Sequence, residues 1–370
     1  MPKIRVLIVD GSVVIRRLLC DELGKDPDLE VVGTAPTGKI ALAKIPQVNP
    51  DIVTMDIERP EMDGLEAVTE IRKIYANLPI IMFSTLSQRA AKETLEALSR
   101  GANDYVTKPT NVGRPALAMQ RVRDKLIPKI KTLCPGLGSP TAPPRPASSL
   151  VSSSARTITA KGPSPDQVVD IVAIGVSTGG PNALNEVFES LPTDLPVPIV
   201  IVQHMPPIFT QCLAERLTTK SGIMVKEGAP GTQLLSGNAW VAPGGYHMVV
   251  TRKGTRVELD LNQHPPENFC RPSVDVLFRS VAQVFGPRTL AVILTGLGED
   301  GLRGCEVLKE CGALIIAQDE ASSVVWGMPG VVAKAGLADT VLPLHLIANE
   351  IVSRIQKGRV QHPLRESALC

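Results

Sequence analysis

Two series of short apolar segments alternate with helix-like segments along this chain, and this alternation constrains the fold more than any other feature. The first series, from Lys3 to about Lys125, contains R-V-L-I-V-D, L-E-V-V-G-T-A, D-I-V-T-M-D, P-I-I-M-F-S and D-Y-V-T-K. Short apolar runs that are each followed by a helix are typical of a parallel sheet with helices on both faces. The first series therefore predicts a flavodoxin-like, doubly wound α/β domain.

The second series begins near Val168 and predicts a second α/β domain. Its segments are V-V-D-I-V-A-I-G-V, P-I-V-I-V-Q, I-M-V-K-E, N-A-W-V-A-P, H-M-V-V, V-E-L-D-L, L-A-V-I-L-T and A-L-I-I-A. Runs rich in Val and Ile between helices favour a doubly wound, mostly parallel buried sheet. The closely spaced segments between Ile223 and Leu261 favour an antiparallel hairpin inserted into it.

A stretch rich in Pro, Ser and Gly separates the two series and cannot bury a core of its own. We therefore predict a first domain over residues 1–125, a linker over 126–167, a second domain over 168–358 and a tail over 359–370.

Composition argues against several classes of protein. A net charge of +2 and an aromatic content of 3% offer neither the field nor the stacking surfaces that nucleic acid would need. No apolar run reaches the roughly 18 residues of a membrane span, so we expect no membrane insertion. The seven cysteines contain no C-x-x-C pair and fit neither a disulfide framework nor a zinc motif. We expect reduced thiols and a cytoplasmic location.

Polar side chains end the predicted strands of the first domain. Asp10, Asp56, Ser84 and Lys108 each stand at the end of an apolar segment. Because parallel strands end at the same edge of a sheet, we expect these side chains to lie close together. Two carboxylates and a lysine suit Mg²⁺ and a phosphoryl group, since Mg²⁺ prefers oxygen ligands and keeps positions open for phosphate.

The motifs V-D-G-S, M-D-I-E-R-P-E-M-D-G, M-F-S-T and Y-V-T-K-P resemble those of two-component response-regulator receiver domains. The resemblance implies that Asp56 accepts a phosphoryl group from a chemotaxis histidine kinase. It also implies that Asp10 is an acid of a Mg²⁺ site. Asp56 and the backbone carbonyl of Glu58, which lies close to Asp56 in sequence, are the other expected ligands. The residues that the resemblance assigns to the switch and to the phosphate contact are Ser84, Tyr105 and Lys108.

One position departs from the receiver pattern. Receivers usually carry two acids after the first strand, whereas Gly11 follows Asp10 here. Because Mg²⁺ depends on carboxylate oxygens, we expect weakened metal binding and slow phosphorylation of Asp56.

A glycine-rich turn in the second domain, I-G-V-S-T-G-G-P, places Ser177 in a G-x-S-x-G pattern between a strand and a helix. Such a turn presents a serine hydroxyl as a nucleophile. A turn of this composition also serves as a phosphate or dinucleotide loop, or simply as a turn, and the motif alone leaves these alternatives open.

A nucleophilic serine needs a base and an orienting acid. His204 directly follows the strand after the one that carries Ser177, and Glu299 and Asp300 follow the segment L-A-V-I-L-T. Three strands would thus bring Ser177, His204 and Asp300 to one edge, as a hydrolytic triad requires. Taken alone, Asp300 is equally well explained as the cap of the helix after it. The remaining histidines are interpreted as structural or surface residues, namely His247, His264, His345 and His362.

Five ordered motifs of the second domain resemble the catalytic domain of the chemotaxis protein-glutamate methylesterase and glutamine deamidase (CheB) family. They are I-G-V-S-T-G-G-P, Q-H-M-P-P-I-F-T, A-P-G-G-Y-H-M, R-P-S-V-D-V-L-F and L-T-G-L-G-E-D-G. The resemblance implies Ser177 as nucleophile, His204 as base and Asp300 as orienting acid. It also implies an oxyanion site near Thr178 and Leu297, where Leu297 replaces a methionine that the family usually carries.

The same resemblance implies a reaction and its partners. The reaction is hydrolysis of glutamyl methyl esters, and deamidation of certain glutamines, on methyl-accepting chemotaxis receptors through an acyl-enzyme. No cofactor is expected for catalysis, and phosphorylation of the receiver is expected to regulate the rate.

Two other functions compete with this interpretation. A response regulator that binds DNA would need a basic recognition helix, which the second domain does not offer. A nucleotide-dependent enzyme would use the loop from Gly175 to Gly180. Arg271 is a candidate to hold an acidic receptor helix, and Ser273 is expected to cap the helix that follows it.

Overall fold

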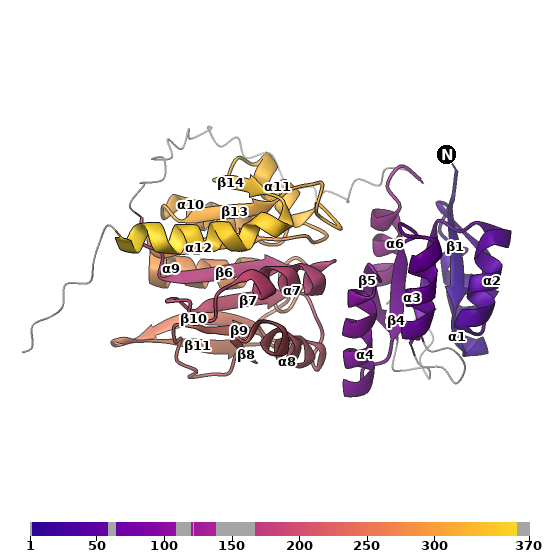
Figure 1. Ribbon diagram of the computed structural model, residues 1–370, viewed down its shortest axis with the longest axis horizontal. Coiled ribbons are helices and arrows are strands. Elements are labelled where there is room, and N and C mark those ends of the chain that lie inside the picture. The colour runs from indigo at the N-terminus through magenta and orange to yellow at the C-terminus, as the bar shows by residue number, and fades with distance from the viewer. Residues whose placement is uncertain (1, 58–63, 109–119, 121, 138–166, 361–370) are drawn as a thin grey trace, which may run out of the picture.

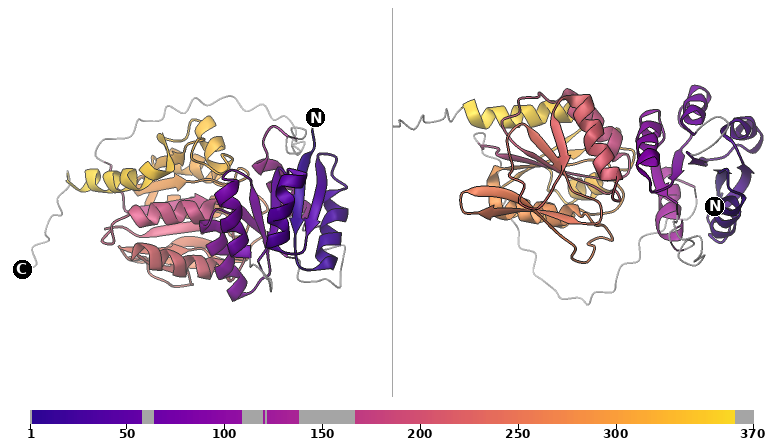
Figure 2. Two further views of the ribbon diagram at one scale, coloured as in Figure 1. Left: turned by 45° about the vertical axis from the view of Figure 1, so that its right-hand side comes forward. Right: turned by 90° about the horizontal axis from the view of Figure 1, so that it is seen from below.

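The computed structural model describes residues 2–57, 64–108, 120, 122–137 and 167–360 (Figure 1). Its helices and strands form two α/β domains that lie side by side in every view (Figures 1 and 2). Within the described residues, no helix is both long enough and apolar enough to cross a membrane.

A five-stranded parallel sheet in the order β2-β1-β3-β4-β5 forms the first domain. Its strands are β1 (Ile4–Val9), β2 (Leu29–Ala35), β3 (Ile52–Asp56), β4 (Ile80–Ser84) and β5 (Asp104–Thr107). Its helices are α1 (Val13–Leu23), α2 (Gly38–Val48), α3 (Gly64–Ile74), α4 (Gln88–Ser99) and α6 (Ile127–Leu133), with a π-helical turn (Val122–Leu126) before α6. This strand order confirms the flavodoxin-like prediction.

Side-chain caps begin three of these helices where the sequence changes from strand to helix. The hydroxyls of Ser12, Thr37 and Ser87 accept from the backbone N–H three residues further on. Such caps satisfy N–H groups that have no partner inside the helix. The turns that follow β1 and β4, next to the polar strand ends, are therefore fixed by local sequence.

The last helix of the first domain runs beyond the boundary that we expected at residue 125. Ile127 and Ile130 on α6 are buried in one cluster with Ile8, Ile81 and Phe83 of the sheet. Because α6 packs into this core, we extend the proposed first domain to the end of α6. The other domain boundaries stay as predicted from the sequence.

A seven-stranded parallel sheet in the order β14-β13-β12-β6-β7-β9-β8 forms the second domain. Its strands are β6 (Ile171–Val176), β7 (Ile199–Gln203), β8 (Met224–Glu227), β9 (Asn238–Val241), β12 (Thr289–Ile293), β13 (Leu314–Gln318) and β14 (Thr340–Leu342). The expected antiparallel hairpin is β10 (His247–Lys253) with β11 (Arg256–Asn262). Strands β8 and β9 join the main sheet instead, and β14 was not predicted because its three residues are not buried.

Helices cover both faces of the second sheet. They are α7 (Gly180–Ser190), α8 (Phe209–Ser221), α9 (Val274–Phe285), α10 (Leu302–Glu310), α11 (Met328–Lys334) and α12 (Leu344–Val360), and a short 3₁₀ turn (Gly286–Arg288) follows α9. Alternate residues of β6 point to opposite faces, so Val172 and Ile174 join the core under α7, α8 and α12, and Ile171 and Ala173 join the core under α9 and α10.

The two domains meet where α4 and β5 of the first domain approach α7 and α8 of the second (Figure 2). The Tyr105 ring stacks on the Phe209 ring with centroids 4.8 Å apart and planes 6° apart. The Asn182 side chain donates to the carbonyl of Leu98 at 2.8 Å, and Arg216 pairs with Glu96 at 3.2 Å. The contact is therefore both aromatic and polar.

Candidate active site

Three neighbouring strands of the second sheet, β12, β6 and β7, place the predicted triad residues at one edge. Ser177 follows β6 directly, and its backbone N–H donates to the carbonyl of Thr295 beyond β12 at 3.0 Å. His204 follows β7 directly, and its backbone N–H donates to the carbonyl of Val176 at 3.2 Å. These backbone hydrogen bonds therefore fix the positions from which the side chains of Ser177 and His204 extend.

The turn after Ser177 requires glycines. Gly179 has a φ of 78°, and a Cβ added there would lie 2.7 Å from Val324. A Cβ at Gly180 would collide with the side chain of Gln203, whose amide donates to the carbonyl of Ser177 at 2.9 Å. The close approach of backbone to Gln203 explains the two adjacent glycines and holds the Ser177 turn in place.

The His204 ring is held through its Nε2 atom. Nε2 lies 2.7 Å from Oδ2 of Asp300, and Nδ1 lies 3.5 Å from Sγ of Cys270. Since the carboxylate of Asp300 accepts the Nε2 proton, the lone pair of the neutral ring is on Nδ1. Nδ1 is therefore the atom that can accept a proton.

The Asp300 carboxylate is buried and accepts four further hydrogen bonds. Its partners are Nδ2 of Asn268 at 2.9 Å, Oγ of Ser273 at 2.8 Å, N of Val274 at 2.7 Å and N of Asp275 at 3.1 Å. Burial by itself raises the pKa of Asp300, but His204 and these backbone donors outweigh it and lower the pKa to about 2. Asp300 is therefore ionised and fixed in orientation.

Two buried carboxylates satisfy the start of each other's helix, which corrects two sequence interpretations. Asp300 precedes α10 but binds the first N–H groups of α9, while Asp275 on α9 accepts from Gly301 and Gly304 at the start of α10, at 3.0 and 2.7 Å. Ser273 stands at the cap position of α9, yet its hydroxyl donates to Asp300 and caps nothing. The expected local caps are replaced by contacts between two helices.

The charges around His204 determine its protonation. Burial lowers the pKa of His204, whereas the charges and hydrogen bonds of Cys270 and Asp300 raise it, and the net effect raises the pKa to about 10. The raised pKa favours the protonated ring. Activity that uses the neutral ring should therefore rise with pH.

The remaining predicted residues of the second domain have varied surroundings. Within the described part of the chain, the Ser177 hydroxyl makes no hydrogen bond, and Leu297 is half-buried. His247 is buried with Nε2 against the carbonyl of Pro265, which fits the structural interpretation. The Arg271 guanidinium binds the carbonyls of Gln263 and His264, so it tethers its own loop.

The polar strand ends of the first domain also come together. Lys108 Nζ lies 2.8 Å from Oδ2 of Asp10 and 2.7 Å from Oδ1 of Asp56, and both acids are buried. Burial and the nearby Asp56 charge raise the pKa of Asp10. Two crowded carboxylates suit a divalent cation that relieves their repulsion, so the residues present fit Mg²⁺ through two side-chain ligands. Glu58, the third expected ligand, lies outside the described residues.

The two predicted switch residues, Ser84 and Tyr105, contact α4 and the second domain. The Ser84 hydroxyl is buried and accepts from Oγ1 of Thr94 on α4 at 2.9 Å. Tyr105 is buried in the stack with Phe209 between the domains. Neither residue was predicted to lie there, because both contacts depend on packing between elements distant in sequence.

One contact links the first domain directly to the residue next to Ser177. Oγ1 of Thr178 donates to Oδ2 of Asp104 at 2.8 Å, and the same carboxylate accepts from Lys129 at 2.6 Å. Thr178 is buried, so the first domain covers the catalytic face beside Ser177. Sequence reasoning did not single out Asp104.

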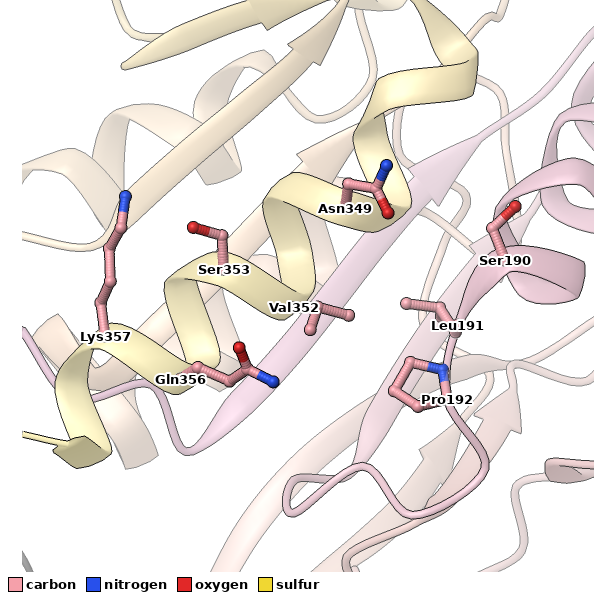
Figure 3. A pocket seen from close by; sticks show the side chains of 8 residues that line it. All are labelled: Ser190, Leu191, Pro192, Asn349, Val352, Ser353, Gln356 and Lys357. Carbon is pink, nitrogen blue, oxygen red and sulfur yellow. The ribbon is translucent and has the colours of Figure 1, made fainter.

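A separate hollow of about 770 Å³ lies between α12 and the residues that end α7 (Figure 3). Its lining comes from Ser190, Leu191, Pro192, Asn349, Val352, Ser353, Gln356 and Lys357. It contains none of the triad residues, and we assign it no function.

The fold and the site define a response regulator whose output domain carries a serine, a histidine and an aspartate at one sheet edge. A family model described as response regulator receiver domain matches residues 6–118, and one described as CheB methylesterase matches residues 172–351.

Named relatives match this chain over nearly its whole length. A protein-glutamate methylesterase/protein-glutamine glutaminase of Trichodesmium erythraeum is 51% identical over 96% of this chain and 100% of its own length. Its namesake in a Nocardioides species is 50% identical over 97% of both chains. The CheB methylesterase catalytic domain of Thermotoga maritima is 40% identical and covers 50% of this chain and 98% of its own, with a TM-score of 0.49. The chain belongs to the protein-glutamate methylesterase/protein-glutamine glutaminase family.

Proposed function

We propose that this chain hydrolyses glutamyl γ-methyl esters on methyl-accepting chemotaxis receptors, and deamidates certain receptor glutamines, in the cytoplasm. The observation that carries the proposal is the His204–Asp300 pair at 2.7 Å beside the strand end that carries Ser177. It is tested by measuring methanol release from methylated receptor membranes, with the variants described in the Discussion.

The residues divide the proposed chemistry among them. Ser177 Oγ attacks the ester carbonyl while Nδ1 of His204 accepts the hydroxyl proton, and Asp300 holds the opposite ring nitrogen. Backbone N–H groups near Thr178 and Leu297 stabilise the oxyanion. The proton then passes to the departing methoxide, methanol leaves, and a water activated by His204 releases the glutamate. With a glutamine substrate, ammonia leaves in the first half of the same sequence.

Regulation is proposed through the receiver. Asp56 accepts a phosphoryl group from a histidine kinase, and Lys108 contacts that group. Asp10 and Asp56 would hold Mg²⁺, which would neutralise charge on the phosphoryl oxygens. Phosphorylation shifts the receiver away from the catalytic face, which is a population shift that leaves the chemistry unchanged. The Asp104–Thr178 contact supports this proposal because it joins the two domains beside the nucleophile.

Replacing Gly11 by an acid should speed phosphorylation. Gly11 is exposed, its φ is not left-handed, and an added Cβ would meet no atom within 4 Å, so Gly11→Asp adds a carboxylate without strain. We expect the original chain to be activated slowly by a small phosphodonor with Mg²⁺, and Gly11→Asp to be activated faster and at lower Mg²⁺. The measurement is esterase rate against donor and Mg²⁺ concentration.

Gly11→Asn is the matched control, because it has the size of aspartate without its charge. It should behave like the original chain. An original chain that no donor concentration activates, next to an activated Gly11→Asp chain, would show that this switch does not work. Equal activation of all three chains would show that the missing acid does not limit metal binding.

Weakening the domain contact should raise the unphosphorylated rate. Asn182→Asp places a carboxylate against the carbonyl of Leu98, and an acid in the first turn of α7 suits the helix itself. Two acceptors that face each other in this partly buried contact cost enough free energy to raise the basal rate by about tenfold. Glu186→Gln, on the exposed side of α7, should change nothing. The phosphorylated rate should match in all chains, and an unchanged basal rate in Asn182→Asp would contradict inhibition through this contact.

A further inference from the structure

Cys270 has no role in the proposed reaction, although its thiol lies directly beside the base His204. Sγ of Cys270 lies 3.5 Å from Nδ1 of His204, and the nearest ligand atoms of His204, Cys270 and Asp300 all lie within 4.8 Å of one another. Cys270 is a free, partly exposed thiol. A small ligand can therefore reach it.

The spacing of these atoms is that of two ligands on one metal ion. Zinc binds sulfur at about 2.3 Å and histidine nitrogen at about 2.0–2.1 Å with tetrahedral angles, which separates the two ligand atoms by about 3.5 Å. The distance between Sγ and Nδ1 is 3.5 Å without any rearrangement.

Asp300 fits the role that a carboxylate usually has behind a metal-bound histidine. Such a histidine donates its other ring N–H to a carboxylate, which sets the tautomer and the ring orientation. Asp300 already accepts from Nε2 at 2.7 Å, and its oxygens are held by Asn268, Ser273 and backbone N–H groups. Asp300 is thus a positioning residue here, and Nδ1 of His204 and Sγ of Cys270 are the ligand atoms.

We propose that His204 and Cys270 form a binding site for Zn²⁺ or another soft divalent cation, and that the occupied form is an inactive esterase. A thiolate with an imidazole selects zinc over magnesium, so the Mg²⁺ that serves the receiver does not compete. On binding, the Cys270 thiol releases its proton to solvent and the protonated His204 ring releases its Nδ1 proton to solvent. A sulfur–zinc bond then forms, and the freed Nδ1 lone pair is donated to the metal. No oxidation occurs, and water fills the other positions.

The inhibition part rests on the proposed function, since it assumes that Nδ1 accepts the Ser177 proton. Metal on Nδ1 removes the base from the reaction, so the two roles of His204 exclude each other. The site would make the esterase sensitive to free zinc in addition to its control by the receiver.

Direct binding is tested with Co²⁺ on the full chain carrying Cys311→Ser and Cys370→Ser as background. A thiolate bound to cobalt gives a charge-transfer absorption that carboxylates of the receiver cannot give. We expect one equivalent of Co²⁺ to produce this band, and Zn²⁺ to displace it. Cys270→Ser and Cys270→Ala should both lose the band, and Asp300→Asn should weaken binding by about 10- to 100-fold. A band that persists in both folded Cys270 variants, or none in the background chain, would overturn the site.

Inhibition is tested in the same background by titrating Zn²⁺ during methanol release, with a chelator to reverse it and a reductant present throughout. Each variant is compared with its own metal-free rate. Cys270→Ser should lose most of the zinc sensitivity, and Cys20→Ser should keep it. An active chain that binds Co²⁺ through Cys270 but is not inhibited would overturn the inhibition. A metal-free chain that releases no methanol would overturn the proposed function, and the cobalt band would still decide the metal site.

Discussion

Ser177→Ala and His204→Ala should each lower methanol release from methylated receptor membranes by at least about 10³-fold. Removal of Ser177 Oγ removes the atom that bonds to the acyl group, and removal of the His204 ring removes the atom that accepts its proton. Because the two groups act as a unit, the double variant should be no slower than the slower single variant.

Ser190→Ala and His264→Ala are matched controls, since both side chains are exposed and neither has a role in the proposed reaction. They should keep the original rate. A normal rate in Ser177→Ala would end the serine-esterase proposal. If Cys270→Ala then lost the rate instead, the nucleophile would be the thiol beside His204.

Residues that directly follow strands were the easiest to place from sequence. Ser177 and His204 come immediately after β6 and β7, and the edge of a parallel sheet brings such positions together whatever the loops do. The same reasoning located Asp10, Asp56 and Lys108 around one cluster. Their functional roles stay predictions, although their neighbourhood follows from strand order alone.

The loop between β11 and α9 could not be predicted in the same way. Asn268 and Phe269 have φ angles of 50° and 61°, in the left-handed region. This backbone conformation places Cys270 next to His204 and Asn268 next to Asp300. No periodic pattern marks such a loop. The absence of a C-x-x-C pair argued against a zinc site, but that rule concerns ligands that are adjacent in sequence, whereas the two ligands of the proposed site are adjacent only in space.

Contacts between elements that are distant in sequence could not be predicted from the sequence either. An acid before a helix predicts a local cap, yet Asp300 and Asp275 each serve the other's helix because α9 and α10 pack together. In the same way, Asp104 gained its partner Thr178 only when two domains met. These acids do not cap the helices next to them in sequence, because tertiary packing gives their buried carboxylates stronger hydrogen-bond donors on other elements.

Asp300→Asn should lower the esterase rate by about 10⁴-fold while leaving the fold intact. The amide oxygen of asparagine can still accept from Ser273 and from the N–H of Asp275 at the start of α9, so this helix keeps part of its support and loses the acceptor of the Val274 N–H. However, an amide NH₂ can face the His204 ring as a donor, which places the ring lone pair on Nε2 and the proton on Nδ1. Nδ1 then cannot accept the Ser177 proton. The measurement is the rate of methanol release, with thermal unfolding as the check on folding.

The pH dependence separates this positioning role from a purely structural one. A general base works when neutral, above its pKa, and the Asp300 charge is one of the causes that raise the pKa of His204 to about 10. Removing that charge lowers the pKa, so the residual activity of Asp300→Asn should begin to rise at lower pH than that of the original chain. Asp275→Asn is the control, because Asp275 is buried and supports α10 without touching His204, and it should lower the unfolding temperature with the pH profile unchanged. A rate for Asp300→Asn within tenfold of the original, at an unshifted profile, would mean that Asp300 only holds α9 and that another group orients the base.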